Sequence, residues 1–538
     1  MQKIYLTEKE FRSIRTKGGV YVDKTKHIYD LFKDDLYFFL ARPRRFGKSL
    51  LCTTLGELFE GNRELFKGLW IDNSDWKWQK HPVIRLDMSK AASKNGTAET
   101  VREGMINMLN DNAEKLGVTN LELDTPYLMF EQLIKKAKDI FNKNVVIIID
   151  EYDKPLLDVI DETARHIEIH RELSDFYSQL KPAESNLKFV LITGVFKFTQ
   201  TSIFSGLNNL NDITFDPAAA EIVGYTEQEI QTFFAQHLEA LALKNNMPTE
   251  EMIVTLRKKY NGYRFGIDVD TGKLAGSVYN AYALNYVFEK QQQLQKWFES
   301  GSPTALIKKL AEKQFLELSP KELLVSFEAL NNSCSPDEIT SLSMLYYAGY
   351  MTMRQCDIDT SGAEPETIIT LDFPNTDVAQ AFAKKLLPLL LRTTIEAVDH
   401  LIRNLNNAFK QQRLEDFKDL LNDILAPINY QVLTWPNNPI PLENLYQIVF
   451  HNTFRACNVR TAMEDTTIRG RIDISVELAN VVYLFEIKRD ESAASAIQQI
   501  KDRDYARKFK HLNKKIYAIG ASINAKDRIV TELAWELL

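Results

Sequence analysis

Four nearly continuous apolar runs in the first 200 residues constrain the fold more than any other feature of the sequence. They lie at 36–42 (LYFFLAR), 81–89 (HPVIRLDMS), 144–153 (NVVIIIDEYD) and 187–196 (LKFVLITGVF), and segments with helical patterning connect them. Strands that are apolar on both faces and joined by helices are typical of a parallel sheet with helices on each side. Residues 1–225 are therefore expected to form an α/β domain.

The rest of the chain has two further patterns. A length of 538 residues allows about three domains. Its composition, 45% hydrophobic and 26% charged, excludes a mainly disordered or fibrous protein. The pattern is mostly helical over 226–380, and the chain ends in a strand, turn, strand, helix, strand pattern. We therefore expect three domains, at 1–225, 226–380 and 381–538.

The spacing of the cysteines and the net charge limit the cellular compartment and the binding partners that we expect for this protein. The four cysteines lie far apart without a CxxC pair, which disfavours a disulfide framework or a zinc knuckle and favours a reducing compartment. The charged start MQKIYLTEKEF lacks the apolar core of a signal peptide, and no apolar run approaches the roughly 20 residues that span a bilayer. The net charge of -7 excludes a wholly basic nucleic-acid coat, although a local basic groove stays compatible with it. A cytoplasmic protein without membrane contact is expected.

A tight loop between the first apolar run and a helix has the features of a phosphate-binding loop. The segment FFLARPRRFGKSLLCTTLGELF (38–59) places Gly47-Lys48-Ser49 at the start of the helix. Backbone N–H groups there would cradle phosphates, Lys48 would reach the β- and γ-phosphates, and Ser49 would ligate Mg²⁺. Arg42 stands where the full pattern has its first glycine, and a plain strand–helix turn is the alternative. The residues expected to bind the nucleotide here are Arg45, Phe46, Gly47, Lys48, Ser49 and Leu50.

The run ending at Asp150-Glu151 supplies the second half of a nucleotide site. An aliphatic strand that ends in two acids is typical of a Walker B strand, in which Asp150 would hold Mg²⁺ and Glu151 would orient the attacking water. Thr193 ends the next apolar run, where it would either contact the γ-phosphate or be an ordinary polar strand end. ATP and Mg²⁺ are therefore the expected cofactors of the first domain.

A second constellation lies in GRIDISVELANVVYLFEIKRD (470–490). Glu486 and Lys488 are two apart on a strand and project to one face, and the preceding hairpin brings Asp473 near them. Two carboxylates of this kind would hold one or two Mg²⁺, or Mn²⁺, and the lysine would position or deprotonate a nucleophile that attacks a phosphodiester. The alternative is an exposed hairpin edge with an ion pair of little energetic value.

Neighbouring helices add further candidates to this constellation. Glu443 lies on an upstream helix and would add a carboxylate, and Gln499 and Tyr505 lie on the helix that follows. The same helix carries five cations that would either contact a phosphate backbone or form an ordinary solvated face: Lys501, Arg503, Arg507, Lys508 and Lys510. The expected partners are nucleic acid, DNA before RNA, and further copies of the chain.

At these residues the sequence resembles a bacterial and archaeal family of AAA-ATPase-like proteins with a C-terminal PD-(D/E)XK nuclease-like domain. The resemblance implies a P-loop NTPase sheet of AAA type, a helical middle domain and a restriction-endonuclease-like α/β core. The first and third domains would carry ATP binding and a metal-dependent nuclease. Arg42 agrees with the family's RPRRFGKS, and Ile472 replaces the proline before Asp473. The resemblance rests on YVDKT (21–25), RPRRFGKSL (42–50), IIIDEYDKP (147–155), YNGYRF (260–265), FPN (373–375), GRIDI (470–474) and FEIK (485–488).

The sequence is compatible with three candidate functions. The first is an ATP-binding, ATP-hydrolysing protein whose nuclease cuts nucleic acid under the control of the nucleotide. The second is a nucleotide-switched module that binds nucleic acid or protein without cleavage. The third is a scaffold in which both sites are vestigial, and the complete sets of lysine and carboxylates disfavour it.

Overall fold

The computed structural model groups the chain into two compact units. The first comprises Met1–Lys296 with Leu324–Pro374, and the second comprises Trp297–Leu323 with Asn375–Leu538. At 390, 442–445 and 464–467 the structure describes the backbone but not the side chains. The described residues are 1–33, 37–92, 96–119, 121, 125–160, 162–197, 204, 210–292, 323–332, 340–362, 364–391, 393–426, 442–457, 459–467, 470–524 and 526–538.

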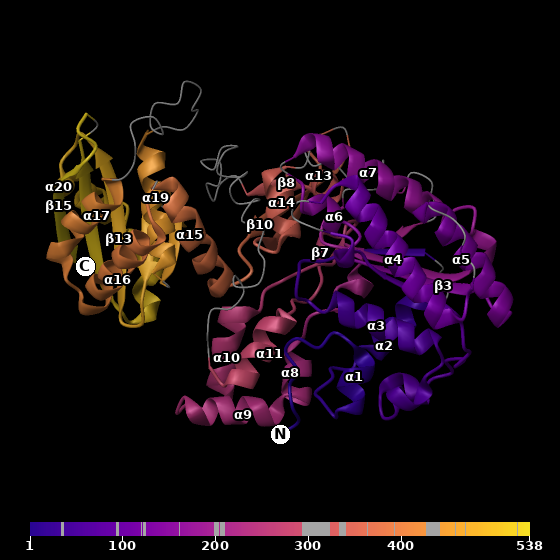
Figure 1. Ribbon diagram of the computed structural model, residues 1–538. Helices are drawn as coiled ribbons and strands as arrows, with labels where there is room; N and C mark the ends of the chain where they lie inside the picture. Colours follow the sequence, from indigo (N-terminus) through magenta and orange to yellow (C-terminus); the bar gives the residue numbers. More distant parts are fainter. Residues whose placement is uncertain are drawn as a thin grey trace. The chain divides into compact units, whose positions relative to one another are not determined.

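A five-stranded parallel sheet forms the centre of the first unit, as predicted (Figure 1). Its order is β2-β3-β4-β1-β5, so the strand before the phosphate loop lies beside β4 and not beside β2. Every residue of β1 and β3 is buried, as expected for inner strands of a covered parallel sheet. The strands are β1 Tyr37–Ala41, β2 Val83–Asp87, β3 Val145–Asp150, β4 Leu187–Gly194 and β5 Asn211–Asp212.

Helices surround this sheet. Among the helices that the structure describes, none has the length and apolar composition needed to cross a membrane. Those of the first 200 residues are α1 Phe11–Thr16, α2 Thr25–Phe32, α3 Lys48–Phe59, α4 Ala98–Leu116, α5 Pro126–Phe141, α6 Lys154–Leu157 and α7 Thr163–Ser178, with short 3-10 helices η1 Arg63–Phe66, η2 Trp70–Asn73, η3 Met88–Lys90 and η4 Glu184–Asn186.

The remainder of the first unit combines a helical group with two small sheets. A helical core forms where Ile4 and Val22 of the N-terminal segment pack with α8–α11. A three-stranded antiparallel sheet of order β8-β10-β9 accompanies it, which the helical reading of 226–380 did not include. The elements are η5 Pro217–Ala219, α8 Glu227–Phe233, α9 Ala235–Lys244, α10 Thr249–Tyr260, β6 Ile267–Asp268, β7 Lys273–Leu274, α11 Ala281–Lys290, β8 Leu324–Ser326, α13 Phe327–Asn331, α14 Ser341–Tyr347, β9 Thr352–Asp359 and β10 Glu366–Asp372.

The second unit contains a five-stranded mixed sheet in sequential order. Its pairs are antiparallel except β13 with β14, which run parallel because α20 connects them. Its elements are α15 Thr376–Leu390, α16 Ile395–Gln411, η9 Leu414–Asp416, α17 Phe417–Leu425, α19 Leu442–Ala456, β11 Arg460–Thr467, β12 Gly470–Glu477, β13 Val481–Arg489, α20 Ala493–Asp502, η10 Tyr505–Leu512, β14 Lys515–Ile523 and β15 Val530–Leu537.

Alternation along β13 separates two cores on the two faces of this sheet. Tyr483 and Phe485 join the core beneath α15, α16, α17 and α19, whereas Val482 and Leu484 join the core beneath α20 and η10. Glu486 continues the second series, since side chains alternate along a strand. It therefore projects to the face that α20 covers.

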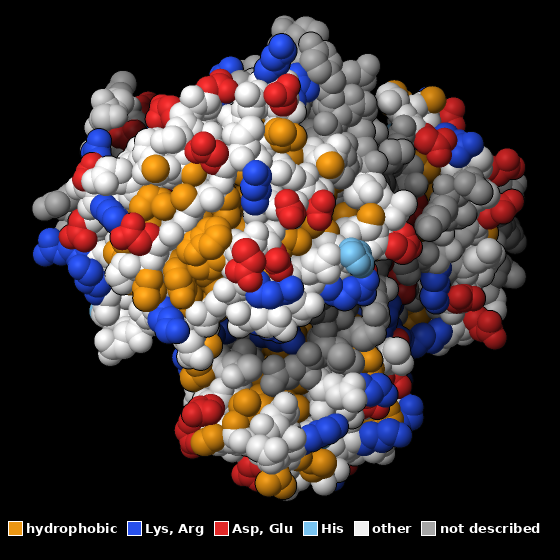
Figure 2. Space-filling view, turned by 90° about the vertical axis from the view of Figure 1, so that its left-hand side faces the viewer, with side chains coloured by type: hydrophobic (Ala, Val, Ile, Leu, Met, Phe, Trp, Pro, Cys, Tyr) orange, Lys and Arg blue, Asp and Glu red, His pale blue; other side chains and the backbone are white. Residues whose placement is uncertain are grey.

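One edge of this sheet carries apolar side chains in solvent. Among the described strands β15 pairs only with β14, and Trp535 and Leu537 are 43% and 55% exposed. The face shown in Figure 2 has hydrophobic side chains gathered in a patch among charged side chains of both signs. At Trp535 and Leu537 the edge strand therefore leaves apolar side chains exposed to solvent.

Candidate functional sites

The loop between β1 and α3 encloses the ammonium group of Lys48. Nζ of Lys48 donates to the carbonyl oxygens of Arg42 (2.8 Å) and Pro43 (3.0 Å). Burial lowers the pKa of Lys48, and the nearby Asp150 acts against this shift. Gly47 closes the loop at φ 109°, a conformation that favours glycine. The loop therefore folds around the Lys48 ammonium, and contact of Lys48 with phosphates stays a prediction.

The side chain of Arg42 stabilises this loop through hydrogen bonds to backbone carbonyl oxygens. Its side chain is 1% exposed and donates to the carbonyl oxygens of Ala41 (2.9 Å), Thr214 (2.6 Å) and Ala219 (3.0 Å). The guanidinium also lies 4.6 Å from the ring centroid of Phe265. This explains how an arginine replaces the first glycine of the pattern: its side chain ties the start of the loop to the segment after β5.

Two other loop residues that were expected to bind the nucleotide also have partners within the protein. The guanidinium of Arg45 lies 3.9 Å from the ring centroid of Tyr282. Phe46 is 1% exposed, and its ring packs edge-on against Tyr263 and Phe265. The Phe46 side chain therefore shapes the loop, and at Phe46 any contact with phosphate would come from the backbone N–H group.

The structure brings Asp150 and Thr193 together at the ends of β3 and β4. Oδ1 of Asp150 accepts from the Thr193 hydroxyl (2.6 Å) and from the backbone N–H of Glu151 (3.1 Å). Glu151 follows directly in a left-handed conformation, φ 52°. The positive φ turns the chain sharply at the Walker B position, where the sequence places the residue that orients water.

Asp153 is a residue of this region that the sequence reasoning missed. Its Oδ2 accepts from the backbone N–H groups of Val195 (2.9 Å) and Phe196 (2.8 Å). Burial raises the pKa of Asp153 to about 6, although these hydrogen bonds and Lys48 oppose the shift. It ties the turn after β3 to the end of β4. The third acid in the string DEYD was the only signal in the sequence.

In the second unit, Asp473 takes a position in the hydrogen-bond ladder of the sheet. The pairing of β12 with β13 extends from Ile474–Phe485 to Glu477–Val482. Beyond it, the backbone N–H of Ile487 donates to Oδ2 of Asp473 (2.7 Å) instead of to a backbone carbonyl. This side-chain bond brings the Asp473 carboxylate next to Glu486, which the hairpin pattern predicted.

Gln499 of α20 joins Glu486 and Lys488 in one network. Nζ of Lys488 donates to Oε1 of Gln499 (2.6 Å) and lies 3.5 Å from Oε1 of Glu486. Nε2 of Gln499 donates in turn to Oε1 of Glu486. The amide therefore fixes both charged side chains in one orientation, and three of the predicted residues meet at one point.

The surroundings of Glu486 disfavour the ionised form of its carboxyl group. It is 2% exposed, and burial together with the neighbouring Asp473 carboxylate raises its pKa to about 8. Its second oxygen, Oε2, is buried without a hydrogen-bond partner among the described residues. A carboxylate oxygen in this condition fits a divalent cation, since oxygen ligands suit Mg²⁺ and Mn²⁺. Among the described residues, no group of three or more His, Cys, Asp or Glu has metal-site geometry. Asp473 and Glu486 supply two candidate oxygen ligands at this place.

Gly470 and Tyr505 close one side of this site. Gly470 has φ 148°, and a Cβ there would lie 3.0 Å from the Tyr505 hydroxyl oxygen. Burial raises the pKa of Tyr505, and a hydrogen bond with Gln499 opposes that shift. The side chain of Glu443, predicted to add a carboxylate, lies outside the described residues.

The five cations after the site have different surroundings. Lys501 pairs with Glu536 (2.6 Å), and Nζ of Lys510 lies 3.9 Å from Asp504. Both pairs are largely exposed, where ion pairs contribute little. Contact of this face with a phosphate backbone stays a prediction.

Comparisons with known proteins match two regions of the chain to known families. The family described as "Predicted AAA-ATPase" matches residues 6–204, and the family described as "PD-(D/E)XK nuclease superfamily" matches residues 442–533. An uncharacterized protein in the vnfD 5′ region of Azotobacter chroococcum mcd 1 is 33% identical over 96% of this chain and 95% of its own length. The two matched regions contain the phosphate loop and the Asp473–Glu486–Lys488 cluster.

Proposed function

Because the chain belongs to the family that joins an AAA-ATPase-like domain to a PD-(D/E)XK nuclease superfamily domain, we propose that it hydrolyses ATP and cleaves nucleic acid, DNA before RNA, in a metal-dependent reaction. One observation carries the nuclease half. Oε2 of Glu486 is buried without a hydrogen-bond partner among the described residues, Oε1 of the same carboxylate lies 3.5 Å from Nζ of Lys488, and the Asp473 carboxylate is close enough to repel the charge of Glu486. Burial of such a charge is costly unless a cation compensates it.

In the first unit the proposed ATP site has separate roles for its residues. Backbone N–H groups of the loop and the start of α3 would hold the phosphates, and Lys48 would exchange its two carbonyl partners for phosphate oxygens. Ser49 and Asp150 would hold Mg²⁺. Glu151 would orient water, and the hydrogen bond from Thr193 keeps the Asp150 carboxylate in place.

In the second unit Asp473 and Glu486 would hold Mg²⁺ or Mn²⁺. Bound there, the metal would lower the pKa of a water ligand and stabilise charge on the leaving oxygen. Lys488 would contact the scissile phosphate or the nucleophile, since its ammonium is already oriented by Gln499. The network also keeps Lys488 close to Glu486, so its positive charge favours the ionised form of that carboxyl group.

Cleavage of linear and circular DNA tests the nuclease half of this proposal. The wild type with Mg²⁺ or Mn²⁺ should cut, and Asp473→Asn and Lys488→Ala should lower the rate by at least about a hundredfold. Lys526→Ala is a matched control, because this exposed lysine lies in the same unit. Equal cleavage by all four proteins would indicate a contaminating nuclease and contradict the assignment.

The same proteins distinguish the nuclease from the second candidate function, a nucleotide-switched binding module without cleavage. It predicts DNA binding that survives Asp473→Asn, together with no cleavage by the wild type. Release of phosphate from ATP, lost in Lys48→Ala, tests the ATPase half independently.

A further inference from the structure

A cavity of about 230 Å³ opens beside the metal-facing edge of the proposed ATP site. Ser49 of α3 and Asp150 of β3 line it, together with residues of the segment before α1, of β2 and of α4. The residues 42–48 of the phosphate loop are not among its lining residues. Since one water takes about 30 Å³, the cavity has room for a phosphate-sized ion beside Ser49 and Asp150.

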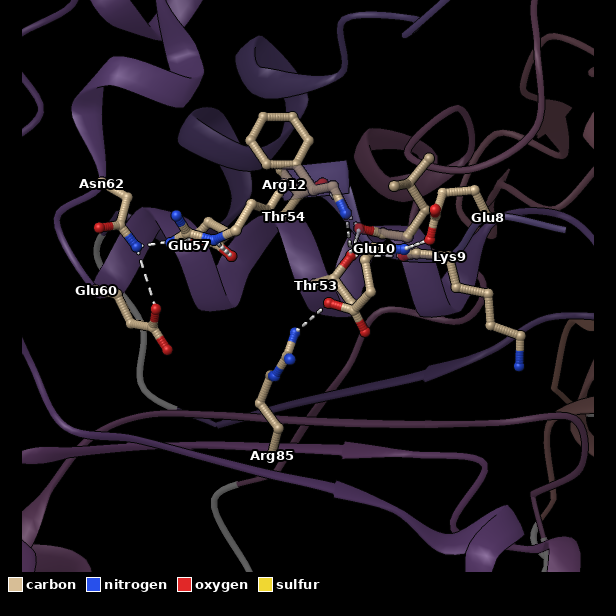
Figure 3. Close-up of polar contacts among 12 residues, drawn as sticks. Glu8, Lys9, Glu10, Arg12, Thr53, Thr54, Glu57, Glu60, Asn62 and Arg85 are labelled. Atoms are coloured by element: carbon tan, nitrogen blue, oxygen red, sulfur yellow. Dashed lines mark hydrogen bonds and ion pairs between the residues drawn. The ribbon is translucent and has the colours of Figure 1, made fainter. Parts of the chain in front are cut away.

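Arg85 is a firmly placed cation in this cavity. Its backbone lies on the edge strand β2, and both polar groups on the free edge bond to one side chain: Asn112 accepts from Arg85 N–H (3.0 Å) and donates to Arg85 C=O (2.9 Å). The stem passes over Gly56 of α3, where a Cβ would lie 3.1 Å from Cδ of Arg85. The guanidinium points toward Glu10, at 3.2 Å (Figure 3).

The segment before α1, which lines one side of the cavity, is hydrogen-bonded to α3. The Thr53 hydroxyl donates to the carbonyl oxygen of Lys9 (2.8 Å) and accepts from the backbone N–H of Phe11 (3.1 Å), and Arg12 pairs with Glu57 one turn further along (Figure 3). These bonds hold the backbone of Lys9 in the cavity wall.

Three lysines complete a basic lining around Arg85. Lys115 pairs with Glu60 (2.5 Å). For Lys9 and Lys90, both exposed, the structure gives no ion pair or hydrogen bond of the ammonium among the described residues. Lys9 and Lys90, which come from two different segments of the chain, are therefore available to a ligand. Arg85 also lines the cavity and is held between α3 and β2.

Four carboxyl groups also line the cavity, and three of them are engaged. Glu10 pairs with Arg85, Asp87 accepts from the Ser89 N–H and hydroxyl, and Asp150 accepts from Thr193. Asp111, exposed on α4, is the fourth. A bound Mg²⁺ at Asp150 would make the lining net positive.

We propose that this cavity is a second phosphate-group site, in which Arg85, Lys9 and Lys90 bind a tetrahedral phosphate next to the nucleotide. Two sources share this chemistry: the phosphate released from ATP, which would form near the Mg²⁺ ligands Ser49 and Asp150 that line the cavity, and a phosphomonoester of a second molecule. Guanidinium and ammonium groups bind phosphate oxygens through charge-assisted hydrogen bonds. The inference rests on the proposed ATP site.

Binding of inorganic phosphate and of phosphoserine to the full-length protein tests this inference. Calorimetry would compare the wild type, Lys9→Ala/Lys90→Ala and Arg85→Gln, each without nucleotide and with Mg²⁺ and ADP. Both variants should weaken phosphate binding by about tenfold or more and keep the affinity for ADP within about twofold. Lys77→Ala/Lys244→Ala removes the same charge from exposed positions of the same unit outside the cavity and should change neither affinity.

The two probes and the two nucleotide states separate the outcomes. Tighter binding of inorganic phosphate with ADP present assigns the site to the product, and tighter binding of phosphoserine assigns it to a second molecule. Equal phosphate affinity in the wild type and both cavity variants overturns the inference, as does binding of neither probe. Failure of the wild type to bind ADP would instead contradict the proposed ATP site, while the samples without nucleotide still report on the cavity. Arg85→Lys, which keeps the charge, should restore part of the affinity lost in Arg85→Gln.

Discussion

Replacement of Arg42 by methionine should destabilise the first unit and leave nucleotide binding largely intact. In a phosphate loop an arginine would ordinarily be expected to contact phosphate. Here the guanidinium is 1% exposed and lies among the carbonyl oxygens of Thr214 and Ala219. Burial lowers the pKa of Arg42 to about 10, which shows how far the group is from water.

The expected size follows from these contacts. Hydrogen bonds to a charged group contribute about 1.5–3 kcal/mol each. Loss of the bonds to Thr214 and Ala219 therefore removes about 3–6 kcal/mol. Methionine fills part of the volume and removes a charge whose burial was itself costly. We expect the free energy of unfolding to fall by about 3 kcal/mol.

Thermal unfolding of the full-length protein measures this effect, with ATP titration at low temperature in parallel. The unfolding transition of the first unit should move down by about 4 °C, and the affinity for ATP should change by less than about threefold. Arg44→Met is the control, since Arg44 is a less buried loop residue and its loss should shift the transition less. An unchanged transition with ATP binding abolished would make Arg42 a phosphate ligand and refute the structural role.

Three further predictions concern other residues. The stability of the second unit without metal should fall from pH 5 to 8, because the unfolded chain releases the proton of Glu486 near pH 4.5 whereas the folded unit holds it to about pH 8. Glu486→Gln should flatten that slope in urea unfolding, and an unchanged slope would contradict the shifted pKa. Asn112→Ala leaves the N–H and C=O of Arg85 without their partner, so it should cost about 2–3 kcal/mol and speed hydrogen exchange at the Arg85 amide; unaltered exchange would show that the edge of β2 does not need it. Gly470→Ala would require a positive φ and a contact with the Tyr505 hydroxyl, so it should lower the stability of the second unit by about 1–3 kcal/mol, and a neutral effect would contradict the strain.

Much of the fold was accessible from the sequence because its patterns are local. The apolar runs predicted β1 to β4 and their parallel character, and the hairpin spacing predicted that Asp473 approaches Glu486 and Lys488. Each of these inferences depends on strand periodicity or on a short loop, which a few neighbouring residues determine.

The features that escaped prediction depend on contacts between distant segments. The role of Arg42 is set by Thr214 and Ala219, more than 170 positions away. The sheet of β8, β9 and β10 was missed because β9 is largely exposed and polar, with few of the apolar residues that mark a strand. The bond from Ile487 N–H to Asp473 could not be foreseen either, since it replaces a regular ladder bond by a side chain.

The central claim, that one chain holds two working phosphate sites, is tested most directly by measuring ATP turnover and DNA cleavage in the same preparations. The wild type, Lys48→Ala and Lys488→Ala would be compared with Mg²⁺ and with Mn²⁺. We predict that Lys48→Ala loses ATP turnover and that Lys488→Ala loses cleavage while it still turns over ATP. Absence of cleavage by the wild type with both metals and in every nucleotide state, or cleavage that persists in Lys488→Ala, would contradict the account.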